Sequence, residues 1–116
     1  MSDEFTVSTH FEGRDAAVAA IYKRIIAETR KFGPMVEDPK KTSIHLNHKS
    51  AFAGIRTQKK ALLLNIKSAA PIQDARIFKS EKLSASRYHQ EVKLTSPEEV
   101  DAQLISWLKE AYLISG

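Results

Sequence analysis

The spacing of hydrophobic residues changes twice along this chain, and these changes limit the folds that it can adopt. Near both ends, apolar residues recur every three or four positions, whereas in the middle they recur at every second position. The first spacing is that of a helix with one buried face, and the second is that of a strand with one buried face. The sequence therefore predicts an α+β fold, with an antiparallel sheet of about five strands between an N-terminal and a C-terminal helix.

The limits of both helices can be predicted from local residues. We expect the first helix at about residues 14–32, because Gly33 and Pro34 then supply the usual stop. The segment 96–99, Ser-Pro-Glu-Glu, has the features of a capping box with proline at the first helical position. On the helix that follows, we expect Trp107 to be buried against the sheet.

Strands are predicted where apolar and polar residues alternate. The alternation is clear in residues 43–48, 61–67 and 88–94, and weaker in residues 52–57 and 76–83. Because one helix precedes the sheet and the other follows it, we expect both helices to pack on the same face. This two-layer sandwich leaves the other face of the sheet to water or to a partner.

The size and composition of the chain limit its class. With 116 residues, it is expected to form one α+β domain over residues 1–116, in which residues 1–12 are a partly extended N-terminal arm. The sequence contains no cysteine, which excludes disulfides and thiolate metal sites. We find no apolar run of membrane-spanning length and no secretory signal, so we expect a cytoplasmic protein that does not interact with membranes.

Basic residues are concentrated in the middle of the chain. Between Lys40 and Lys93 there are twelve basic residues and three acidic ones, a balance of +9 in a chain whose net charge is +4. This segregation favours an anionic partner, either nucleic acid or an acidic small molecule or protein. The alternative is that these lysines protect sheet edges from aggregation.

The polar residues expected on the exposed sheet face are the candidates for ligand binding. Lysine and arginine would supply charge, and polar strand residues would orient the ligand. The predicted set is Lys41, Ser43, His45, Asn47, Arg56, Arg87 and His89. We therefore predict a noncatalytic binding module that needs no cofactor.

Two other functions stay open. If the strands that carry His45 and His89 are adjacent, these imidazoles and Glu91 could form a proton-transfer site or bind zinc or iron. The chain could also act as a protein–protein adaptor or form a homodimer through its open sheet face or an edge strand. No Walker loop or Gly-x-Ser-x-Gly motif is present, so the sequence favours a protein without catalytic activity.

Several short motifs together resemble a family of small uncharacterised bacterial domains, a domain of unknown function. They are His10-Phe11, Phe32-Gly33-Pro34, Lys41 to Leu46, Phe52 to Ile55, Arg87-Tyr88-His89, Leu94-Thr95-Ser96, Trp107-Leu108 and Ala111-Tyr112. The resemblance covers nearly the whole chain and implies a fold but no activity. More remotely, the order helix, antiparallel sheet, helix is similar to that of the frataxin-like domains, including the YdhG and YjbR groups, which implies DNA- or iron-related roles. The first helix, however, exposes mostly basic residues where frataxins have an acidic ridge.

Overall fold

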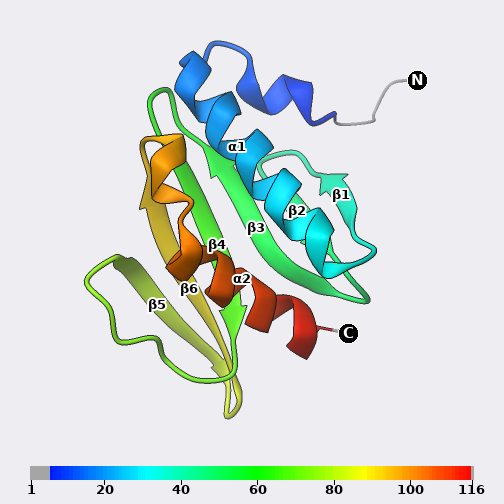
Figure 1. The fold of residues 1–116 in the computed structure, drawn as a ribbon, viewed down its shortest axis with the longest axis vertical. Helices are drawn as coiled ribbons and strands as arrows, with labels where there is room; N and C mark the ends of the chain where they lie inside the picture. The colour runs from blue at the N-terminus through cyan, green and yellow to red at the C-terminus, as the bar shows by residue number, and fades with distance from the viewer. Residues whose placement is uncertain (1–5, 116) are drawn as a thin grey trace.

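The computed structural model describes residues 6–115 and has an α+β fold, as the sequence predicts. An open, six-stranded antiparallel sheet carries two α-helices on one face (Figure 1). The helical segments are η1 (Ser8–Phe11), α1 (Ala16–Thr29), η2 (Arg30–Phe32), η3 (Pro97–Glu99) and α2 (Ala102–Ile114). The strands are β1 (Val36–Pro39), β2 (Ile44–Asn47), β3 (Ala51–Thr57), β4 (Leu62–Ser68), β5 (Ile77–Ser84) and β6 (Arg87–Leu94).

The sheet contains the five predicted strands and one more. Its spatial order is β1-β2-β3-β4-β6-β5, so β6 lies between β4 and β5 although it follows both in the sequence. The additional strand is β1, whose four residues are too few to show a clear alternation. It is attached to α1 by Tyr22, whose hydroxyl donates a hydrogen bond of 2.5 Å to Glu37. Burial and this carboxylate raise the pKa of Tyr22.

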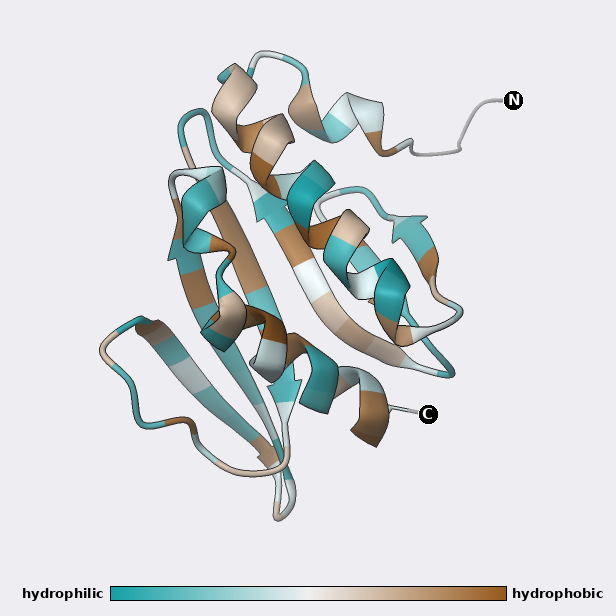
Figure 2. Cartoon of the chain, in the orientation of Figure 1, coloured by the Kyte–Doolittle hydropathy of each residue, from teal (hydrophilic) through white to brown (hydrophobic). Residues whose placement is uncertain are grey.

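The core fills the space between the helices and one face of the sheet. The inward residues of α1 and α2 meet the inward residues of the central strands, and most of them are fully buried. Figure 2 shows hydrophobic segments on the helices where they meet the sheet, and a largely hydrophilic or pale β5 with hydrophobic residues toward its ends. Strand β5 lies at the sheet edge, and its Phe78 and Leu83 are exposed.

The end of η2, the 3₁₀ turn that continues α1, is fixed by a close approach that only glycine permits. Gly33 has φ of 147°, and a β carbon there would lie 2.5 Å from the hydroxyl of Tyr112. The same hydroxyl donates a hydrogen bond of 2.9 Å to the carbonyl of Pro34. The predicted glycine–proline stop therefore also joins the end of the first helix to the second helix.

The C-terminal helix starts later than the capping box alone suggests. Ser96 and Glu99 do form a capping box, but it caps the 3₁₀ turn η3, and α2 begins after Asp101, whose carboxylate accepts from the Leu104 amide. Trp107 packs against the core, as predicted, but it is only partly buried. The helix instead buries a stripe starting at Leu104, and the guanidinium of Arg76 lies 5.9 Å from the Trp107 ring centre.

Part of the expected N-terminal arm lies outside the described residues. Of residues 1–12, the structure describes only those from residue 6 onward, and Ser8–Phe11 form a 3₁₀ helix. Within residues 6–115, no helix is both long enough and apolar enough to cross a membrane.

Two leucines on α2 provide a matched test of this packing. Leu108 is fully buried and Leu113 is 63% exposed. We expect Leu108→Ala to lower the free energy of unfolding by about 2–5 kcal/mol, because it removes apolar contacts and leaves a cavity. Leu113→Ala should change it by less than about 0.5 kcal/mol. Chemical denaturation measures both, and equal losses would contradict the assignment of the buried face.

Candidate functional site

The sheet face opposite the helices carries the predicted polar residues. Strand pairing aligns His45, Gly54, Asn65 and Glu91 in one row across β2, β3, β4 and β6. Paired residues point to the same side of a sheet, so these side chains lie opposite the buried row of Ile44, Ile55, Leu64 and Val92. The alternation of the strands thus separates a core face from a polar face.

Three adjoining depressions hollow this polar face, and Asn65 lines all of them. We call them together the open-face hollow. Its polar lining consists of Ser43, His45, Arg56, Asn65, Lys67, Lys79, Glu81, His89 and Glu91. The part between His45, Lys67 and His89 has a volume of about 100 Å³ and no carboxylate in its lining. Since a water molecule occupies about 30 Å³, a carboxylate or phosphate group is of suitable size for this part.

Gly54 leaves space at the floor of the hollow. A β carbon at this position would lie 3.8 Å from the Asn65 β carbon and 3.9 Å from the His45 ring, both ordinary contact distances. A small side chain would therefore fit without strain, and a larger one would fill the depression. Glycine inside a strand weakens the sheet, so this position offers space at the expense of strand stability.

The charges around the hollow are unevenly arranged. Burial lowers the pKa of Lys67, and the nearby Arg87 lowers it further. The pKa of His89 is also lowered, first by burial; Glu81 opposes this shift, while Lys67 and His45 add to it. Positive charge on Lys67 and His89, at one end of the hollow, is therefore unfavourable in the absence of an anion.

At the other end of the hollow, a basic and an acidic side chain form an ion pair with each other. Arg56 pairs with Glu91 at 3.3 Å, and the Glu91 side chain is only 10% exposed. Removing either partner would leave the other charge without compensation at this site. Arg56 thus both lines the hollow and compensates Glu91.

The structure brings together four of the seven predicted site residues. Ser43, His45, Arg56 and His89 line the open-face hollow. The other three lie outside its lining: Asn47 donates to Asp38 at 3.4 Å, Arg87 donates to the carbonyl of Ser86, and Lys41 lines a different pocket.

The strands that carry His45 and His89 are not adjacent, so the condition for the metal or proton-transfer site is not met. Strands β3 and β4 separate β2 from β6, which places the Cα atoms of His45 and Glu91 about 14 Å apart at roughly 4.8 Å per strand. Within residues 6–115, no group of three or more His, Asp or Glu side chains is arranged to hold a metal ion. The set of His45, His89 and Glu91 is therefore not assembled as three metal ligands.

The sequence interpretation did not include Gly54, Asn65 or Lys67 among the site residues. Gly54 could have been found, because a glycine inside a predicted strand often marks a close approach or a depression. Lys67 falls on the same alternating face as Asn65, but a strand lysine by itself resembles any solvated charge.

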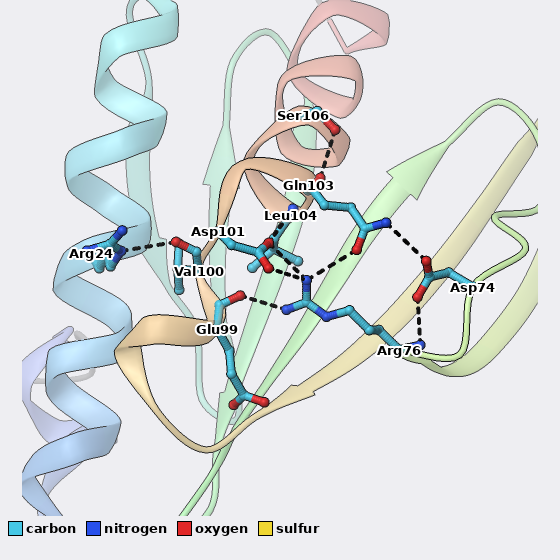
Figure 3. Close-up of polar contacts among 9 residues, drawn as sticks. All are labelled: Arg24, Asp74, Arg76, Glu99, Val100, Asp101, Gln103, Leu104 and Ser106. Atoms are coloured by element: carbon cyan, nitrogen blue, oxygen red, sulfur yellow. Dashed lines mark hydrogen bonds and ion pairs between the residues drawn. The ribbon is translucent and has the colours of Figure 1, made fainter.

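A second polar cluster joins the loop before β5 to the start of α2 (Figure 3). Arg76 donates to the Asp101 carboxylate at 2.9 Å and to the Glu99 carbonyl at 2.6 Å. Asp74 accepts from the Arg76 amide and from the side chain of Gln103. Because these groups satisfy one another, we assign the cluster a structural role.

The comparisons with known proteins identify the family. The model of the family described as Domain of unknown function (DUF5655) matches residues 7–115. The chain belongs to this family. No curated protein and no solved structure was found to match the chain. The match extends from η1 to α2, and the family description assigns no activity.

The lowered pKa of His89 predicts a pH dependence of stability. Its pKa lies below 6.5 in the folded chain, so the unfolded chain binds this proton more readily. The free energy of unfolding should therefore decrease as the pH falls below 6.5 toward the folded pKa. Ring NMR titration should give a pKa below 6.5, which Lys67→Met should raise and Lys93→Met should leave unchanged. A pKa at or above 6.5, or equal effects of the two variants, would contradict this electrostatic account.

Proposed function

We propose that this chain is a noncatalytic binding module that holds the anionic group of a small ligand in the open-face hollow. The observation that supports it most is the part of the hollow between His45, Lys67 and His89, which has basic and amide groups and no carboxylate. A carboxylate or phosphate there would receive hydrogen bonds from Lys67 and Asn65 and favourable charge from the imidazoles when these are protonated.

The charges around the open-face hollow favour an anion as the ligand. Burial lowers the pKa of Lys67 and is also the largest cause of the lowered pKa of His89, which Lys67 and His45 lower further. A bound anion would offset this repulsion and stabilise the protonated form of His89. Binding and protonation of His89 should therefore favour each other.

A small ligand suits the hollow better than a nucleic acid strand. Glu81 and Glu91 lie in its lining, and they would repel an extended row of phosphates. The lining also includes no exposed Phe, Tyr or Trp on which bases could stack, since its Phe52 is fully buried. The two carboxylates are better suited to hydroxyl or amino groups on the remainder of a small molecule.

Filling the hollow without changing its charge tests the proposal. Gly54→Val adds a branched side chain beside His45 and Asn65, at a backbone position outside the positive-φ region. We expect saturable amide shifts at Gly54, Asn65 and Lys67 when phosphate or acetate is titrated into the unmodified protein, followed by ¹H–¹⁵N NMR. Gly54→Val should weaken this binding at least about tenfold, and Gly54→Ala should weaken it less.

Stability and nucleic acid binding provide the controls. Gly54→Val should unfold at the same or higher denaturant concentration, because valine favours strands over glycine. Unchanged phosphate and acetate binding in a folded Gly54→Val protein would contradict the proposal. Tight, salt-dependent binding of an oligothymidylate that Gly54→Val does not alter would instead indicate that the basic residues of the sheet bind nucleic acid.

A further inference from the structure

A second pocket lies on the helix side of the chain, near the start of α1. It is lined by Thr9, His10, Arg14, Lys41, Thr42 and Thr57 and has a volume of about 410 Å³. Thr57 pairs with Leu62, which is buried beneath the helices, so this pocket opens on the side opposite the open-face hollow. We call it the threonine pocket.

The walls of the threonine pocket are joined by hydrogen bonds between distant segments. The imidazole of His10 donates through Nε2 to the Lys40 carbonyl at 2.8 Å, since a carbonyl can only accept. The Thr57 hydroxyl donates to the His10 carbonyl at 2.5 Å, and Arg14 Nε donates to this hydroxyl at 3.1 Å. These bonds fix η1, the β1–β2 loop and the end of β3 relative to one another.

The groups that remain available are hydrogen-bond donors. Because Nε of Arg14 is held by Thr57, the position of its guanidinium is restricted while its two terminal nitrogens have no partner among residues 6–115. Within the same residues, the ammonium of Lys41 and the hydroxyl of Thr42 also have no hydrogen-bond or ion-pair partner. None of the six lining residues is acidic.

Of the two adjacent lysines, Lys40 and Lys41, only Lys41 has an unpaired ammonium in the threonine pocket among residues 6–115. The Lys40 ammonium pairs with Asp38 at 2.9 Å and does not line the pocket. Two adjacent lysines thus differ in role: one is neutralised by a carboxylate of β1, and the other faces a pocket without carboxylates.

We propose that the threonine pocket binds a tetrahedral oxyanion of the phosphate type. The planar fork of Arg14 can donate to two of its oxygens, and Lys41 and Thr42 can donate to the others. Such a group offers acceptors in several directions, which matches donors from two chain segments, Arg14 on one and Lys41 and Thr42 on the other, better than a planar carboxylate does. This site is independent of the open-face hollow and uses none of its residues.

Titration with inorganic phosphate and with glycerol phosphate, followed by ¹H–¹⁵N NMR, tests the proposal. Both probes should cause saturable shifts at the amides of His10, Thr42 and Thr57. Lys41→Met should weaken this binding about tenfold, as expected for loss of one charged donor, while Lys40→Met should change it less than about twofold. Thr42→Val, which removes only the hydroxyl, should also weaken it.

The outcomes separate this site from the proposed function. Equal affinity for the two probes would identify free phosphate as the ligand, and tighter binding of glycerol phosphate would identify an esterified phosphate. No saturable shift at these amides, or equal losses in Lys40→Met and Lys41→Met, would overturn the proposal. The amides of Gly54 and Asn65 report on the open-face hollow in the same titration, so either site can fail while the other stands.

Discussion

The whole structure depends on burial of only one face of the sheet. Helices α1 and α2 pack on the row that contains Ile55 and Leu64, and their apolar stripes supply the rest of the core. Burial of this apolar surface is the main favourable contribution to folding. The opposite face contributes less to the core. Polar residues and a depression on this face therefore cost little stability.

This division explains why the open-face hollow coexists with a well-packed core. Gly54, Asn65 and Lys67 occupy central strands, but they point away from the helices. A depression on this face exposes polar groups without creating a cavity in the core, where the loss of contacts would be costly. The Arg56–Glu91 pair limits the cost of placing a nearly buried carboxylate on the same face.

The elements that are attached by polar contacts lie at the margins of the core. Arg76 holds the loop before β5 against the start of α2, and His10 and Thr57 hold η1 against the sheet. These contacts act between segments far apart in the sequence, so they fix positions that local patterns cannot define. The threonine pocket results from this attachment, since its lining residues come from three such segments.

The sequence by itself determined which residues form helices and strands and which side of each strand is buried. Period-two alternation placed His45 and His89 on the polar face, because side-chain direction in a strand is a local property. Glycine and proline likewise determined where the first helical segment stops, at the end of η2. Strand β1 and the partial exposure of Trp107 escaped prediction, since the first is short and the second lies at the edge of the buried stripe of α2.

Only the tertiary structure decided which polar residues are neighbours. Alternation gives the face of a residue but not the order of the strands, and here β3 and β4 lie between the two histidine-bearing strands. The same limit applies to Lys41, which the charge pattern grouped with the open face and the β1–β2 loop places on the other side, near Arg14. Contacts between segments distant in the chain arise from packing of the complete core, so no local pattern of residues contains them.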